Sequence, residues 1–107
     1  MDSVIISPSG EVTEGPKLGE AKSFSLEQQR EGIGGGWVEH VPLRHHLEEG
    51  VEEISVDGVE IGRIPQGCVA VVDEEGTLKK QPPNDLASTL CGRLVVGQVL
   101  IAKLEVL

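Results

Sequence analysis

The sequence contains very few aromatic residues and half as many bases as acids. Phe24 and Trp37 are its only Phe, Tyr or Trp residues, and 9 lysines and arginines stand against 18 aspartates and glutamates. The resulting net charge of −9 repels a phosphate backbone, and two rings offer little surface for bases to stack on. These shortages argue against a nucleic-acid-binding protein, so we expect no nucleic-acid partner.

Long apolar runs and a basic leader are also lacking. The longest apolar stretch, Leu94 to Leu107, is too short to span a bilayer and contains Lys103 and Glu105. The first residues, Met1 to Val4, do not have the basic and apolar regions of a signal peptide. We therefore expect a cytoplasmic protein with no membrane partner, in the host cell cytoplasm if a phage encodes it.

Cysteine is scarce, and no motif typical of a metal site is present. Cys68 and Cys91 do not form a C-x-x-C pair, so a zinc site built on cysteine pairs is not expected. In a reducing cytosol the two thiols are expected to be buried apolar groups and not a disulfide. His40, His45 and His46 do not have the spacing of H-E-x-x-H or of another established ligand set. We expect no metal and no cofactor.

Short strands dominate what the sequence does contain. Apolar runs bounded by turn residues predict strands over 4–6, 11–13, 37–41, 68–72 and 94–104, with a bend at Gly97 and a short return over 77–79. The capping box Ser25-Leu26-Glu27-Gln28 predicts that a short helix begins after Ser25. Asn84 is placed to cap a second helix over 85–90, which Gly92 would end in the left-handed conformation.

A two-residue hairpin is the strongest local signal. Asp57-Gly58 is a typical type I′ turn sequence, and it would pair Val56 with Val59, Ile54 with Ile61 and Glu52 with Arg63 within a hairpin over 48–64. Together the elements predict one α+β domain over 1–107. Its mostly antiparallel β-sheet would have about five to seven short strands, with two short helices on one face.

Part of this pattern resembles a known family. The residues that carry the resemblance are Val71 to Gly76, Leu78, Pro83-Asn84, Ala87, Leu90 and Val96-Gly97, and a weaker match covers 4–6, Ser25 and Gly36 to Glu39. This D-E-x-G…P-N-x-x-A pattern, from Asp73 to Gly97, is similar to an uncharacterised family known as a domain of unknown function and common in phages and actinobacteria. The 48–64 hairpin looks like an insertion relative to it. Since no activity is established for the family, the resemblance implies a viral or mobile-element origin, not a reaction.

Four residues form the predicted ligand or partner site. Asp73 and Glu74 stand at a strand end and Asn84 at a helix start, where carboxylates and an amide can converge on one ligand, and Trp37 completes the set. The alternative interpretation is local: Asp73 and Glu74 shape a turn and Asn84 caps a helix.

The segment 47–61 holds six acids and no base, and this offers a second candidate surface. Glu48, Glu49, Glu52 and Glu53 are expected to form an acidic surface that either keeps the protein in solution or covers a basic host protein.

These observations favour a small non-enzymatic binding protein. Gly34-Gly35-Gly36 lacks the lysine of a phosphate loop and predicts a hinge or a tight helix-to-strand turn, and no G-x-S-x-G frames a nucleophilic serine. The expected partner is a small ligand that the protein sequesters or a host protein, such as a defence component that it inhibits. The apolar segment from Leu94 to Leu107 is expected to be an exposed sheet edge that pairs copies into a homo-oligomer. The alternatives are an acidic interaction protein and an enzyme of unknown reaction that uses Asp73 and Glu74.

Overall fold

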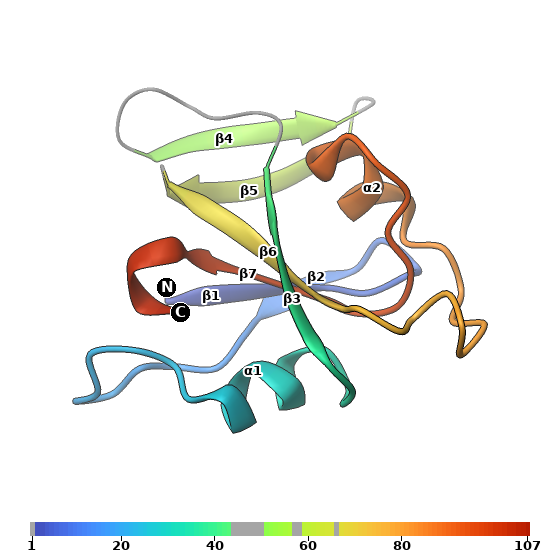
Figure 1. The fold of residues 1–107 in the computed structure, drawn as a ribbon. Helices are drawn as coiled ribbons and strands as arrows, with labels where there is room; N and C mark the ends of the chain where they lie inside the picture. Colours follow the sequence, from blue (N-terminus) through green and yellow to red (C-terminus); the bar gives the residue numbers. More distant parts are fainter. Residues whose placement is uncertain (1, 44–50, 57–58, 66) are drawn as a thin grey trace.

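A five-stranded antiparallel sheet forms the centre of the protein. The structure is a computed structural model that describes residues 2–43, 51–56, 59–65 and 67–107, with the backbone alone described over 51–56 and 59–65 (Figure 1). The strand order in the sheet is β2-β1-β7-β6-β3. Its strands are β1 (Ser3–Ile6), β2 (Val12–Glu14), β3 (Val38–Pro42), β6 (Cys68–Asp73) and β7 (Val99–Lys103). The predicted α+β class and the antiparallel sheet are confirmed.

The central strands bury both of their faces. All six residues of β6 are buried, as are the first four of β7. One face of the sheet, which carries Val4, Ala70 and Ile101, forms the larger apolar cluster together with Ala87 and Leu90 of α2 (Asp85–Cys91). The opposite face carries Val71 and Leu100, which pack against Ile33 at the end of α1 (Leu26–Gly32).

The two helices therefore cover opposite faces of the sheet, and the prediction that they share one face was wrong (Figure 1). Consecutive strand residues point to opposite faces, so the apolar runs of β6 and β7 supply two apolar surfaces, and each requires its own cover. The predicted caps of both helices are confirmed. Ser25 and Gln28 form the capping box, Asn84 caps α2, and Gly92 ends α2 with a φ of 69°.

The C-terminal apolar segment differs from the prediction. Strand β7 begins at Val99 and not at Leu94, because Gly97 has a φ of 76° and breaks the extended backbone. The carbonyl of Val95, before this glycine, accepts a hydrogen bond from the backbone N–H of Asn84. A 3₁₀ turn, η1 (Leu104–Val106), follows the strand. Since β7 lies between β1 and β6, it has no free edge, and the exposed apolar edge expected of this segment is wrong.

Strands β4 (Val51–Val56) and β5 (Val59–Pro65) pair as a separate two-stranded ribbon, and β4 contacts α2 (Figure 1). Val56 pairs with Val59 as predicted, while Asp57 and Gly58 lie outside the described residues. A register shift between Ile54 and Ser55 then pairs Ile54 with Gly62 and Glu53 with Arg63, so the predicted pairs beyond the turn were wrong. A bulge of this kind adds a residue to one strand, which the alternation of apolar residues did not reveal.

The segment 74–80 forms successive turns in place of the predicted return strand over 77–79. The Lys79 amide donates to the Glu75 carbonyl, the Lys80 amide donates to the Thr77 carbonyl, and Lys80 has a φ of 57°. These local hydrogen bonds use the backbone groups that a strand would offer to a neighbour.

Candidate functional site

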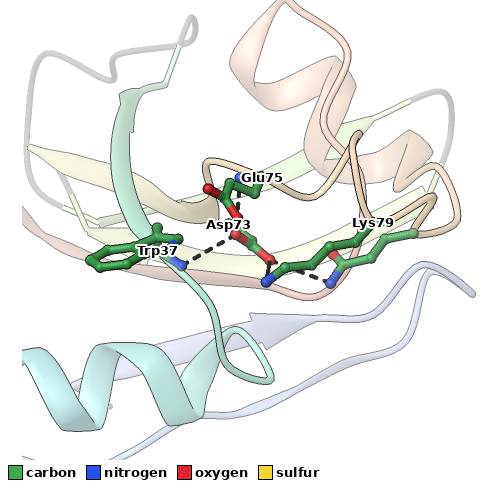
Figure 2. Close-up of polar contacts among 5 residues, drawn as sticks. Trp37, Asp73, Glu75 and Lys79 are labelled. Carbon is green, nitrogen blue, oxygen red and sulfur yellow. Dashed lines mark hydrogen bonds and ion pairs between the residues drawn. The ribbon is translucent and has the colours of Figure 1, made fainter.

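Asp73, the last residue of β6, is the centre of the polar site. Its side chain is only 1% exposed, and it lies on the face of the sheet that α1 covers. Figure 2 shows two segments of chain converging on it: Trp37, the residue before β3, and the turns after β6, which carry Glu75 and Lys79. The Asp73 cluster consists of Asp73, Trp37, Glu75, Lys79 and Gln81.

Four donors share the two carboxylate oxygens of Asp73. Oδ1 accepts from the amide of Trp37 at 3.3 Å and from the amide of Glu75 at 3.0 Å. Oδ2 accepts from Nζ of Lys79 at 2.8 Å and from Nε2 of Gln81 at 3.5 Å. A buried carboxylate requires partners of this kind, because removing a charge from water without compensation is costly.

The charge of Asp73 is set by two opposing effects. Burial raises the pKa of the carboxyl, but the hydrogen bond and charge of Lys79 and the amides of Glu75 and Trp37 outweigh it. The net effect is a pKa below the usual value for aspartate, so Asp73 is ionised at neutral pH. In the ion pair with Lys79 only one partner is buried, because the Lys79 side chain is 41% exposed.

Trp37 combines a fixed main chain with an open ring. Its amide donates to Asp73 and its carbonyl accepts from the amide of Glu74 at 2.7 Å. The residue is nevertheless 58% exposed, and the guanidinium of Arg30 in α1 lies 5.4 Å from the ring centroid. This is a cation–π arrangement, which holds the indole against the helix while leaving more than half of the residue open.

Gly36 allows this approach. Its φ is 104°, and a Cβ placed on it would lie 2.5 Å from Oδ2 of Asp73. Gly34 and Gly35 also have positive φ, but a Cβ at either position would meet no atom within 4 Å. Of the two predicted forms of this glycine run, the structure has the tight turn between α1 and β3. Gly36 is the position where a side chain would collide with the cluster.

The other predicted site residues lie in different settings. Glu74 is exposed, and its amide fixes Trp37. Asn84 is fully buried and its side chain is fully engaged: Nδ2 donates to the carbonyls of Ile6 and Gly97 at 2.9 and 2.8 Å, and Oδ1 accepts from the amide of Ala87 at 3.1 Å. Asn84 thus ties the start of α2 to the end of β1. Trp37, Asp73 and Glu74 are brought together, whereas the contacts of Asn84 are all outside the Asp73 cluster.

Sequence reasoning missed Lys79, Gln81 and Arg30. The turn sequence Asp73-Glu74-Glu75-Gly76 carries the signal for one contact, because aspartate commonly accepts from the amide two residues later. Lys79 and Gln81 follow at distances fixed only by the succession of turns over 74–80. Arg30 reaches Trp37 across the turn between α1 and β3, and neither residue's position in the sequence indicates that contact.

The side chains of the predicted acidic surface lie outside the part of the chain that the structure describes. Glu48 and Glu49 are outside the described residues, and for Glu52 and Glu53 only the backbone of β4 is described. His45 and His46 are also outside. Over the described ranges, no group of three or more His, Cys, Asp or Glu side chains is placed to hold a metal ion. His40 contacts Gln29, with Nε2 of the ring 2.8 Å from Oε1 of the amide.

Comparisons with protein-family models, with curated proteins and with solved structures found no match. The resemblance of the Asp73–Gly97 segment to the phage and actinobacterial family stays a prediction. In the part of the chain that the structure describes, no helix has the length and apolar character needed to cross a membrane.

The hydrogen bonds of the Asp73 cluster hold the backbone of Trp37 in a fixed position at the surface. Both oxygens of the carboxylate are engaged by donors from the chain itself, and the side chain is almost completely enclosed. What the cluster presents outward is the Trp37 ring, with Arg30 against the ring and Glu74 beside the Trp37 carbonyl.

Proposed function

We propose that this chain is a small non-enzymatic binding protein whose contact surface is centred on Trp37. The observation that carries the proposal is a tryptophan 58% exposed although both main-chain polar groups are held by the Asp73–Glu74 segment. Tryptophan and arginine are among the residues most enriched at the energetic centres of interfaces, and here an exposed Trp37 lies against Arg30.

Pre-organisation strengthens the argument. Binding is opposed by the entropy lost when contact residues become ordered, about 0.5–1.5 kcal/mol for each immobilised side chain. The Trp37 backbone is already fixed by the Asp73 cluster, and its ring is already placed by Arg30. A partner that covers the ring therefore gains apolar burial without ordering this part of the surface.

The partner comes from the setting that the family resemblance implies. A phage or mobile-element protein of this kind would bind a host protein, such as a defence component, or sequester a small ligand. The open ring favours a host protein, because a partner surface can cover an indole that is more than half exposed.

A single fluorine label tests the proposal. Trp37 is the only tryptophan, so 5-fluorotryptophan gives one ¹⁹F NMR resonance against a silent background. A bacterial host lysate would be divided into macromolecular and small-molecule fractions. We expect the macromolecular fraction to broaden or shift the resonance, whereas an effect of the small-molecule fraction alone would identify the partner as a ligand. An unchanged resonance with both fractions would contradict the proposal.

A matched pair of variants provides the control. Trp37→Ala and Leu94→Ala each remove the large apolar side chain of a residue that is more than half exposed. Leu94 follows α2, which covers the face of the sheet opposite to α1 and Arg30. Immobilised Trp37→Ala should fail to retain whatever the wild-type chain retains, and immobilised Leu94→Ala should retain it. Equal retention by the two variants would place binding elsewhere.

A further inference from the structure

Strand β3 is the longer of the two edge strands of the five-stranded sheet. It pairs with β6 on one side, and no described strand pairs with its other side. The opposite edge strand, β2, has only three residues. An exposed edge presents a row of backbone donors and acceptors to which another extended chain can add.

The register shows which groups of β3 point outward. The amide of Glu74 donates to the carbonyl of Trp37, so these two residues form a hydrogen-bonded pair in the ladder. Such pairs alternate in an antiparallel ladder, and Glu39 and Val41 therefore bond to β6. Val38, His40 and Pro42 direct their backbone groups away from the sheet. Proline suits this position because its missing amide hydrogen would point outward.

The side chains of β3 carry little unbalanced charge. Glu39 is paired with Arg93, whose Nη2 lies 2.9 Å from Oε1 of Glu39. His40 on the opposite face contacts Gln29. Exposed edges are commonly protected by unbalanced charges or by prolines. In β3 only Pro42, at the end of the strand, is a protection of that kind.

From this pattern we infer that β3 pairs with β3 of a second copy of this chain, antiparallel and with His40 on the two-fold axis. In this register the His40 amides donate to each other's carbonyls, and each Val38 amide donates to the Pro42 carbonyl of the other copy. Every outward donor of β3 is then satisfied, and Pro42 is needed only as an acceptor. Glu39 lies opposite Val41 of the other copy, whereas a register centred on Glu39 would place two carboxylates face to face.

The net charge of the chain opposes the pairing and makes the dissociation constant of the dimer depend on salt concentration. Two copies that each carry −9 repel one another, and salt screens this repulsion with a Debye length of about 10 Å at 0.1 M. A five-residue strand pair is also smaller than a standard interface. We expect a weak dimer whose dissociation constant decreases as salt is added.

Sedimentation equilibrium on wild type and on an edge pair of variants tests the inference. Val38→Pro removes an outward amide hydrogen from β3, and Glu14→Pro removes one from β2, since the Gly15 amide donates to Ser3 and places Glu14 outward. Val38→Pro should raise the dissociation constant at least tenfold, and Glu14→Pro should not weaken the dimer. A wild type that is monomeric at all concentrations and salts, or a Val38→Pro variant that dimerises as the wild type does, would overturn the inference.

Two further measurements guard against a misfolded proline variant. His40→Glu places two carboxylates together on the axis and should weaken the dimer, while His40→Gln should not. Amide exchange read by NMR locates the interface. The Val38 and His40 amides should exchange quickly in dilute protein and slowly in concentrated protein, whereas the Glu39 and Val41 amides should be protected in both. Val38 and His40 amides that behave alike at both concentrations would also refute it.

Discussion

The Asp73 side chain joins two segments of chain. Trp37, the residue before β3, and three residues of the segment after β6, Glu75, Lys79 and Gln81, all donate to its two oxygens. Burial alone would favour the neutral acid, so the ionised form depends on these donors being in place. The position of Trp37 on the surface and the charge state of a buried carboxylate are therefore consequences of the same contacts.

Replacing Asp73 with asparagine is expected to lower the free energy of unfolding by about 2 kcal/mol at neutral pH, the usual scale for hydrogen bonds to a charged group. Because the folded-state pKa is lowered, the carboxylate stabilises the protein fully above its unfolded value of about 3.9. That stability is lost as the pH falls through the lower folded value. Urea unfolding followed by Trp37 emission, at pH 7 and in acid, measures the difference.

The control for this substitution is Glu74→Gln, which removes an exposed carboxylate next to Asp73 in the sequence. It should leave the free energy of unfolding nearly unchanged at pH 7. A difference between wild type and Asp73→Asn that stays constant from neutral pH into acid would show that the ionised carboxylate is not the source of the stability.

Alanine substitutions at Gly36 and Gly34 distinguish the cost of a steric collision from the cost of backbone strain. Both have positive φ, which costs an alanine about 1–2 kcal/mol, but only at Gly36 would the new Cβ meet the Asp73 carboxyl group. Gly36→Ala should therefore destabilise more than Gly34→Ala and should also shift Trp37 emission. Thermal unfolding of the two variants side by side provides the test, and equal losses would mean that the cluster yields to the methyl group without cost.

At this scale the sequence predicted local roles better than long-range ones. The turn at Asp73 and the caps at Ser25 and Asn84 follow from what each side chain can do to backbone groups two or three residues away. The contacts of Lys79 and Arg30, and the second and third hydrogen bonds of Asn84, join residues whose proximity depends on the whole fold.

Among the elements, the two helices are equal in length but differ in how their caps are buried. Ser25 caps α1 at an exposed site, whereas Asn84 caps α2 from a fully buried one and also bonds to β1. When an exposed cap is removed, water can form part of the hydrogen bonds that the cap made. A buried cap leaves its partners without a hydrogen bond when it is removed, so we expect α2 to depend on its cap far more than α1 does.

This difference predicts unequal alanine substitutions. Ser25→Ala should cost about 1 kcal/mol, the typical loss of a cap. Asn84→Ala should cost about 3 kcal/mol or more, because the carbonyls of Ile6 and Gly97 also lose a donor in a buried site. Chemical denaturation of both variants measures the two losses. Similar losses would indicate that water enters the Asn84 site.

Element prediction failed where pairing partners decided the outcome. The run from Leu94 to Leu104 has strand propensity throughout, but Gly97 and the hydrogen bond from Asn84 to Val95 take its first half out of the sheet. The bulge in the β4–β5 ribbon shifts a register that alternation alone had fixed differently. Neither a positive φ at a particular glycine nor an added residue in one strand is visible in the periodicity of the side chains.

For the whole molecule, the apolar character of β6 and β7 reflects their central place in the sheet. The sequence predicts a free edge for the C-terminal run, but the strand order places β7 in the middle of the sheet, where apolar residues on both faces are required. The same composition fits both positions, since the sequence shows that a strand is apolar but does not show which strands lie beside it.

The reactivity of the two cysteines tests how well the larger apolar cluster excludes solvent. Both are free thiols: Cys68 is buried in the larger apolar cluster, as predicted, whereas Cys91 is only half-buried against it. Burial raises the pKa of each to about 11, partly offset by the charges of Lys103 and Arg93. At pH 8 a thiol reagent should modify Cys68 only as fast as the protein unfolds, and Cys91→Ser isolates that reaction. Rapid modification of Cys68 in the folded protein would contradict its burial.

The raised pKa values also predict an alkaline limit to stability. The thiols ionise near pH 8.5 in the unfolded chain and near 11 in the folded one, so their contribution is complete below about 8.5. It is lost as the pH rises towards 11. Unfolding free energies measured from pH 8 to 11 should decline, and a Cys68→Ala, Cys91→Ala double variant should decline less.

The pairing of Ser3 with Ala102 also bears on how the chain folds. Strand β7 follows the other four strands of its sheet in the chain, yet it forms the link between β1 and β6. Until β7 has emerged during synthesis, no strand pairing of the described sheet joins the β2–β1 half to the β6–β3 half. Closing so long a segment of chain is entropically slow, and it makes folding a late event that depends on this last strand.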